Sequence, residues 1–153
     1  MPSNSAAGPD TERRGTAVPE SWADAEARYE SLGATARSVV RETARAMGFD
    51  RAEYDDRVTG EVVETARQAL FAETLAVRVA DRGTFDAWRE TYPGDVRVAG
   101  SDTVARVAWH VSPAADAAVA ATFENEPDAA VGTVRRMAFN RLYRERLAPE
   151  AAE

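Results

Sequence analysis

The stretch VRVAGSDTVARVAWHV, residues 96–111, decides the fold class. On both sides of the segment Gly100–Thr103, apolar residues alternate with other residues, as they do in half-buried strands. We therefore expect a strand over residues 96–98, a four-residue hairpin loop, and a second strand over residues 104–111. One sheet face then carries Val96, Val98, Ala105, Val107, Trp109 and Val111.

The segment before this stretch predicts one more strand and a helix. Leu75–Val79 alternates as a half-buried strand does, and the turn Asp81–Thr84 leads into a short helix. Phe85, Trp88 and Tyr92 lie on one face of that helix. A strand–helix–strand unit of this length predicts a right-handed crossover between parallel strands.

The segment after this stretch has two interpretations. Ser112-Pro113 followed by alanines is a fair helix start, whereas Val119–Phe123 reads as a further, antiparallel strand. The apolar run is short and ends in Thr-Phe before a turn, which favours the strand over residues 113–123. A long terminal helix is expected from Glu126 to about Leu147. Its core stripe is Val131, Val134, Ala138 and Leu142.

The first half of the chain predicts helices. Apolar residues recur at helical spacing over residues 20–32, over 35–47 and from Thr59 onward, and Asp50 can cap a short turn. The predicted buried stripes are Trp22, Ala25, Tyr29 and Leu32 in the first helix, Ala36, Val39, Val40, Thr43 and Met47 in the second, and Val62, Val63, Ala66, Ala69 and Leu70 in the third.

These elements predict an α+β fold. A helical N-terminal half precedes a small mixed sheet of three or four strands, in the order β-α-β-β with a further strand if residues 113–123 form one, and a long C-terminal helix follows. We expect a single α+β domain over residues 20–147. Residues 1–19 contain three prolines and two glycines with little to bury, which predicts a disordered tail, and residues 148–153 are expected to fray.

The composition excludes several kinds of chemistry. The 153-residue chain has no cysteine and one histidine, His110. Disulfides, thiolate metal sites, a cysteine nucleophile and a two-histidine metal site within one chain are therefore excluded. No segment matches a glycine-rich phosphate loop or a dinucleotide fingerprint. We expect no metal and no cofactor.

The charge pattern indicates a habitat. All 19 basic residues are arginine, lysine and isoleucine are missing, and 26 acidic residues give a net charge of −7. An evenly acidic surface discourages binding to nucleic acid and to anionic membranes. Lysine-free, acidic, alanine-rich chains are typical of salt-loving archaea. No apolar run is long enough for a signal peptide or a membrane span, so we expect a cytoplasmic protein of a halophile.

Four short stretches resemble those of a known family. They are Tyr29–Gly33 (YESLG), Ala46–Asp50 (AMGFD), Val107–His110 (VAWH) and Arg135–Phe139 (RRMAF). Together, and in this order, they resemble an uncharacterised family of small proteins from halophilic archaea, a domain of unknown function. The resemblance covers roughly residues 20–147. It implies the same habitat, and it implies no activity or functional residue.

The sheet suggests an anion-binding site. With the four-residue loop, Arg97 lies directly opposite Arg106, and His110 points to the same face. Arg78 can join them from the preceding strand. Two like charges opposite each other destabilise a hairpin, so a nearby carboxylate or a bound anion should compensate. The first interpretation is a structural charge network, and the second is a phosphate or anion site made of Arg78, Arg97, Arg106 and His110.

Other charged residues have similar alternatives. His110 can act as a general base only with a partner that orients it, and an ordinary strand histidine is the simpler reading. The row of Arg37, Arg41 and Arg45 on the second helix is either a solvated face or a strip for an acidic partner. The terminal helix carries Arg135, Arg136, Arg141, Arg144 and Arg146, which ring it and form no stripe at about 100° per residue.

Three functions follow from these patterns. The first hypothesis is a non-catalytic cytoplasmic protein that acts by binding a protein partner or a second copy of itself. It is favoured by the lack of a catalytic constellation and by alanines on the outer sheet positions Ala76, Ala80, Ala99 and Ala108. The alternative is a binder of an anionic small molecule, such as a phosphate or nucleotide, through the sheet-face arginines. The third is an enzyme that uses His110.

Overall fold

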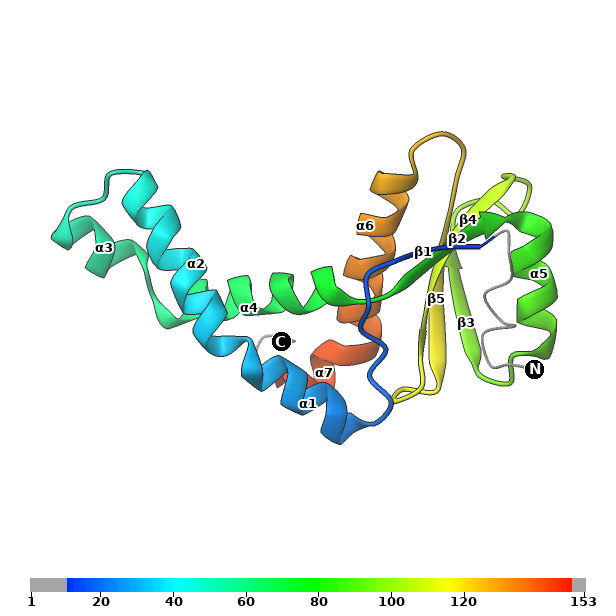
Figure 1. The fold of residues 1–153 in the computed structure, drawn as a ribbon, viewed down its shortest axis with the longest axis horizontal. Helices are drawn as coiled ribbons and strands as arrows, with labels where there is room; N and C mark the ends of the chain where they lie inside the picture. Colours follow the sequence, from blue (N-terminus) through cyan, green and yellow to red (C-terminus); the bar gives the residue numbers. More distant parts are fainter. Residues whose placement is uncertain (1–10, 150–153) are drawn as a thin grey trace.

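The computed structural model describes residues 11–149, and Figure 1 shows a sheet flanked by helices with further helices extending away from it. The elements in chain order are β1 (Glu12–Arg14), α1 (Trp22–Ser31), α2 (Gly33–Ala46), α3 (Arg51–Arg57), α4 (Gly60–Thr74), β2 (Val77–Asp81), α5 (Arg82–Thr91), β3 (Asp95–Ala99), β4 (Arg106–Ser112), β5 (Ala117–Phe123), α6 (Pro127–Ala138), η2 (Phe139–Tyr143) and α7 (Arg144–Leu147). The predicted α+β fold, with a helical first half and a long C-terminal helix, is confirmed.

The described strands form one mixed sheet of five strands in the order β1-β2-β4-β5-β3. β2 pairs antiparallel with β1 and β4, β4 pairs antiparallel with β5, and β3 pairs parallel with β5. Residues 113–123 therefore contain a strand, and the strand interpretation is confirmed. β2 and β3 run in the same direction, as the crossover through α5 predicted, but β4 and β5 lie between them.

The predicted hairpin between residues 96–98 and 104–111 is wrong. β5 lies between β3 and β4, so Arg97 is opposite Val119 and Arg106 is opposite Phe123. β5 consists mainly of alanine and valine, and such a strand suits the middle of a sheet that helices cover closely on both faces. The alternation in residues 96–111 predicts strands correctly, but it does not say which strands pair.

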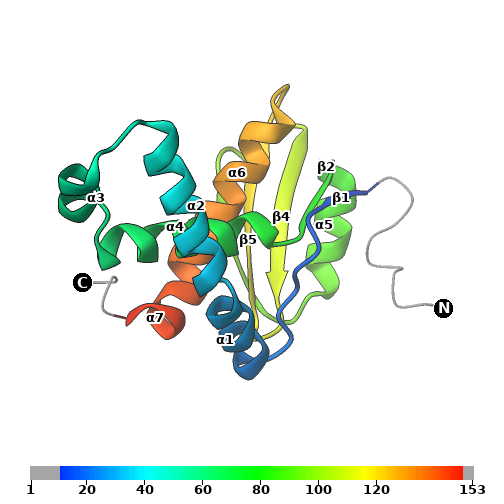
Figure 2. The same cartoon turned by 60° about the vertical axis from the view of Figure 1, so that its left-hand side comes forward.

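Each face of the sheet is covered by a different helix (Figure 2). α5 covers a cluster that contains Val107 and Trp109, with Val96, Val98 and Val111 packed against it, as the alternation predicted. α6 covers the other face. Of the four alanines expected at outer positions, Ala76, Ala80 and Ala108 are buried, whereas Ala99 at the end of β3 is exposed.

The N-terminal segment differs from expectation. Residues 12–14 form the edge strand β1, and Ala17 is buried and bridged to Leu75, so the fold begins before residue 20. The sequence of β1, Glu-Arg-Arg, has no apolar alternation. An edge strand can keep polar side chains in solvent, so it does not require that alternation. Arg14 holds the strand in place through ion pairs with Glu12 and Asp128. Residues 1–10 of the expected tail lie outside the described residues.

The C-terminal helix contains a turn of different geometry. Between α6 and α7, the N–H of Arg144 donates to the carbonyl oxygen of Phe139, five residues earlier, which is a π-helical bond. Phe139 and Tyr143, at the two ends of this turn, are both buried. Ala148 is also buried, so the end expected to fray over 148–153 is still packed at its first residue. Residues 150–153 lie outside the described part.

Helices α2, α3 and α4 form what we call the arm, which extends away from the sheet in Figure 1. Its helices start where the sequence predicts: Asp50 and Glu53 form a capping box for α3, and Thr59 caps α4. α2 packs along α4. The base of the arm joins the core through Phe71, which contacts the rings of Tyr29 and Tyr143.

The close packing of β1 rests on a glycine. Gly15 has φ +84°, and a Cβ there would lie 2.5 Å from the carbonyl oxygen of Leu75. Gly48 also has positive φ, +74°, but nothing lies within 4 Å of its Cβ position. Gly48→Ala should therefore cost only backbone strain, about 1 kcal/mol. We expect Gly15→Ala to lower the free energy of unfolding clearly more, as measured by urea denaturation. Equal losses in the two variants contradict the packing described for β1.

Candidate functional site

The four residues proposed as an anion site do not come together. Residues directly opposite each other on neighbouring strands share a face of the sheet. Arg78 is opposite Trp109 and therefore lies on the α5 face. Arg97 and His110 are both opposite Val119, so they lie on the α6 face with the whole width of β5 between them. The wrong hairpin is the reason for this difference.

Arg78 lies among aromatic rings. Its guanidinium carbon is 5.9 Å from the centre of the Trp88 ring, and burial lowers the pKa of Arg78. Its Nη1 and the indole nitrogen of Trp109 are buried without a hydrogen-bond partner among the described residues. The side chain is therefore part of the packing between the sheet and α5.

Arg106 has compensating neighbours at the start of β4. Its cross-strand partners are Asp81 on β2 and Phe123 on β5. The guanidinium carbon lies 5.0 Å from the centre of the Phe123 ring, which is a cation–π distance. The predicted hairpin placed Arg97 opposite Arg106, whereas in the structure Asp81 is directly opposite Arg106. The carboxylate of Asp81 compensates the charge of Arg106, so no bound anion is required there.

His110 is a structural residue. Its side chain is 0% exposed; Nδ1 lies 2.8 Å from the carbonyl oxygen of Ala76 and Nε2 lies 2.9 Å from the Tyr143 hydroxyl. Because a carbonyl oxygen can only accept, Nδ1 carries the proton and Nε2 accepts from Tyr143. Burial lowers the pKa of His110 to about 4. Both nitrogens are occupied, so this geometry does not support the enzyme hypothesis based on His110.

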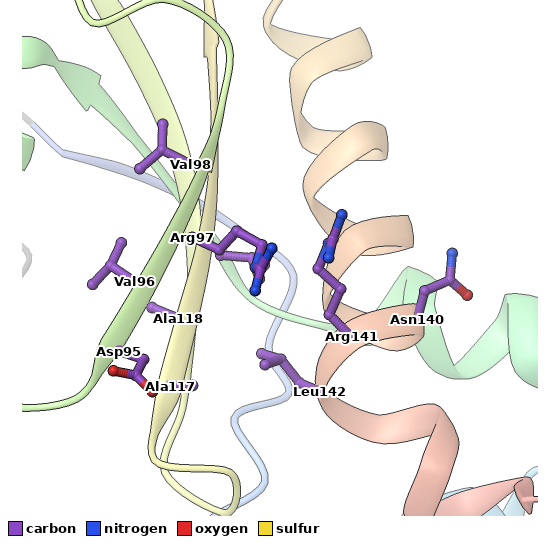
Figure 3. Close-up of a pocket in the computed structure, with 10 residues that line it drawn as sticks. Asp95, Val96, Arg97, Val98, Ala117, Ala118, Asn140, Arg141 and Leu142 are labelled. Carbon is purple, nitrogen blue, oxygen red and sulfur yellow. The ribbon is translucent and has the colours of Figure 1, made fainter. Parts of the chain in front are cut away.

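Arg97 lies in an open groove of about 730 Å³ between the sheet and the C-terminal helix. β3 and the start of β5 form one wall, and Asn140, Arg141 and Leu142 of η2 form the other. Figure 3 shows the side chains of Arg97 and Arg141 pointing toward each other across this groove. Neither arginine makes a hydrogen bond or an ion pair with any described residue. Asp95, on the rim, is the acidic residue of the lining.

Sequence reasoning missed Arg141 and Asn140. A regular helix places Arg141 in a ring of arginines without a stripe, because each residue turns by about 100°. The π-helical turn changes that angle between residues 139 and 143. Neither the position of this turn nor the approach of η2 to β3 has a signal in the sequence. The recurrence of arginine in residues 135–146 is the only hint it offers.

The arm is a second candidate surface. None of residues 45–70 is buried, although they form regular helices. The stripe predicted for α4 is among them: Val62, Val63, Ala66, Ala69 and Leu70. In α2, Ala36 and Val40 are buried as predicted, but Val39 is 43% and Met47 is 63% exposed. Within the described part of the chain, the arm thus exposes Val39, Met47 and Val62 and covers Val63, Ala66 and Leu70 only in part.

The arm also carries charged side chains without an ion pair among the described residues. Arg37 and Arg41 on α2 line a groove of about 360 Å³ together with Arg67 and with residues of α3 and α4. Arg67 pairs with Glu64, whereas Arg37 and Arg41 have no ion pair among the described residues. On α3, the same is true of the neighbouring carboxylates Asp55 and Asp56.

Residues 11–149 show neither a metal-binding cluster nor a membrane-spanning helix. Within this range, no three acidic or histidine side chains gather as a metal site requires. No helix in the same range combines the length and apolar character that crossing a membrane requires.

The burial of His110 makes stability depend on pH. Its pKa falls from 6.5 to about 4 on folding, so below pH 6.5 the unfolded chain binds the proton more tightly. The stabilisation is full above pH 6.5 and is lost as the pH falls toward 4, by about 3 kcal/mol in total. In the variant His110→Gln, the glutamine side chain has no group that titrates in this pH range. We expect the variant to lose this part of the pH dependence in urea unfolding, and an unchanged slope contradicts the assignment.

The comparisons with known proteins give a family but no activity. No curated protein and no solved structure matches the chain. A family model, described as a family of unknown function, matches residues 16–144, which include every element from α1 to η2. This range contains all four stretches on which the resemblance rested. The chain therefore belongs to the family of unknown function DUF5809.

Proposed function

We propose that the protein acts without catalysis, by associating with a second copy of itself through the arm. One observation carries this proposal: residues 45–70 include the capped helix α3 and most of the capped helix α4, and none of these residues is buried. Isolated helices of this length are marginally stable in water, and most of their stability in proteins comes from packing of the apolar face. A partner that covers the arm would supply that packing.

The distribution of charge favours a second copy over an unrelated partner. Arg37 and Arg41, without ion pairs among the described residues, lie in the first half of α2. The neighbouring carboxylates Asp55 and Asp56 lie on α3 at the outer end of the arm, together with Arg51 and Arg57 (Figure 1). If two arms lie antiparallel about a two-fold axis, the basic row of each meets the acidic end of the other. A two-fold interface repeats every contact twice, so one complementary pair of patches gives two.

Exposed apolar residues supply further energy. At about 100° per residue, Val39 lies about 160° around α2 from Arg37 and Arg41, so the proposed contact extends to a second side of this helix. Val39, Met47 and Val62 are the large hydrophobic side chains exposed within residues 11–149, and all belong to the arm. Each is already about half covered, so completing its burial contributes about 1 kcal/mol. Two paired helices from each copy form a four-helix arrangement, which is a common way to bury amphipathic helices. Stable interfaces bury about 1,200–2,000 Å² in total, which helices of this length can provide.

The proposed setting is the cytoplasm of a halophile. The chain contains no lysine and has a net charge of −7 spread over its length. At molar salt the Debye length is about 3 Å, so repulsion within an acidic surface is screened and only charges in contact attract each other. In such a medium an acidic chain can fold, and oppositely charged side chains in contact between two arms still attract each other.

The arm interface is tested by substituting its exposed apolar side chains. Met47→Glu and Val39→Glu each place a charge where the proposed dimer excludes water, so we expect the dimer dissociation constant to rise by about ten-fold or more. Ala87→Glu, on the exposed side of α5, is the matched control and should leave the constant unchanged. Light scattering after size-exclusion chromatography gives the mass. A wild-type chain that is monomeric at all concentrations contradicts the proposal.

Charge reversal tests the antiparallel arrangement. The variant Arg37→Glu/Arg41→Glu and the variant Asp55→Arg/Asp56→Arg should each be monomeric, because each opposes like charges twice. Mixed together, they should form a heterodimer, in which the acidic row of one meets the basic end of the other and the reverse. A mixture that remains monomeric, or single variants that dimerise as the wild type does, argues against this arrangement.

The proposed habitat is tested by salt. We expect the melting temperature to rise between about 0.1 M and about 2 M potassium chloride, because screening removes repulsion among the excess carboxylates. Differential scanning calorimetry at constant protein concentration measures the change. A melting temperature that stays flat or falls over this range counts against an adaptation to brine.

A further inference from the structure

The groove lies at the edge of the sheet, between the edge strand β3 and the turn η2 that follows α6. β3 has one neighbour among the described strands, β5. α6 packs on β2, β4 and β5, and the chain continues from it into η2. The side chain of Arg97 therefore points to the α6 face at the sheet edge and faces η2 across the groove, as Figure 3 shows.

The π-helical turn supplies the opposite wall. Phe139 and Tyr143 anchor the turn in the core, and Tyr143 is further held by the hydrogen bond with His110. Asn140 and Arg141, between these anchors, line the groove. The guanidinium of Arg141 is thus carried by a turn whose two ends are packed, which limits how far it can move.

The two guanidinium groups face each other without a carboxylate between them. Within the described part of the chain, ion pairs involve Arg14, Arg28, Arg45, Arg67, Arg82, Arg135 and Arg146, but neither Arg97 nor Arg141. Asp95 lies on the same groove, but it forms no ion pair with either arginine in the described structure. Two like charges that point at each other repel, and an anion between them reverses the sign of the interaction.

We infer that this groove binds the phosphate group of a small phosphorylated molecule, with Arg97 and Arg141 as the two arms of a clamp. A guanidinium presents a planar fork that bonds two oxygens at once. A phosphate monoester has three terminal oxygens and up to two negative charges, so two forks on opposite walls can each bond two oxygens with one oxygen shared, and both positive charges are balanced. The side-chain amide of Asn140 adds a further donor on the same wall.

The size of the groove indicates that the ligand is larger than phosphate itself. Its volume of about 730 Å³ lies in the range of about 300–1,000 Å³ found for small-molecule sites. Ala117, Val119 and Leu142 give it an apolar part. Asp95 repels a second anionic group at its end of the groove and accepts hydrogen bonds there. The structure thus assigns one phosphate at the arginines and an uncharged, hydroxyl- or amine-bearing body beside it.

Binding is tested by NMR titration of the full chain at constant ionic strength. The probes are inorganic phosphate, adenosine monophosphate and, as the carboxylate comparison, acetate, each against chloride. We expect phosphate and adenosine monophosphate to shift the amide signals of Val119 and Asn140. Adenosine monophosphate should bind more tightly than phosphate, because its body contacts the groove. Acetate binding as tight as that of phosphate overturns the assignment to phosphate.

Three variants locate the site. Arg97→Gln and Arg141→Gln should each raise the dissociation constant for phosphate by about ten-fold or more. Arg89→Gln on α5, which removes the same charge from an exposed position, is the matched control and should bind as the wild type does. Equal binding by all three variants, or no saturable shift at millimolar phosphate, overturns the proposal. Arg97 and Arg141 are exposed and unpaired, so both variants should melt at the wild-type temperature without ligand.

Discussion

The buried hydrogen bond between His110 and Tyr143 fixes where the C-terminal helix lies on the sheet. His110 comes from β4 and bonds the carbonyl oxygen of Ala76 on its other side, so it joins two parts of the sheet region to η2. The ring of Tyr143 also contacts Phe71 at 5.3 Å and Trp22 at 6.0 Å between ring centres. One side chain thereby connects the sheet, α1, the base of the arm and η2.

Both proposed surfaces depend on this connection, although they lie in different parts of the molecule. Tyr143 closes the π-helical turn that carries Arg141 opposite Arg97. Phe71 is the buried residue of α4, and it ties the arm to the same cluster. Apart from Phe71, the buried residues of the arm within the described chain are Ala36, Val40 and Ala44 of α2. The outer helices of the arm therefore depend on their caps, on the packing of α2 against α4, and on the proposed second copy. The sheet region has its own core on both faces.

Local structure was largely predictable from the sequence, because its causes are local. Asp50 and Thr59 cap helices where the sequence places the helix starts, and the alternation in residues 104–111 predicts β4. The order of strands was not predictable in the same way. The alanine-rich β5 can pair with several partners, and only the complete sheet places it between β3 and β4. β1 was missed because a polar edge strand lacks alternation.

The candidate site was predictable only in part. Arg97 was expected to face an anion, and its face of the sheet is correct, but its expected neighbour Arg106 is paired with Asp81 and Phe123 instead. Arg141 could not be found, because the π-helical turn changes the angle of every later residue of the helix. The stripe on α4 was recognised as apolar, but periodicity alone does not distinguish an apolar face buried within one chain from a face buried between two.

Hydrogen–deuterium exchange at two protein concentrations tests the central claim, that a second copy covers the arm. The amides of residues 45–70 should exchange slowly in a concentrated solution and much faster on dilution below the dimer dissociation constant, because packing against the partner suppresses local opening. The amides of β4 and β5 should not respond to dilution. Equally fast exchange of residues 45–70 at both concentrations would contradict the account, since the arm would then be uncovered in solution.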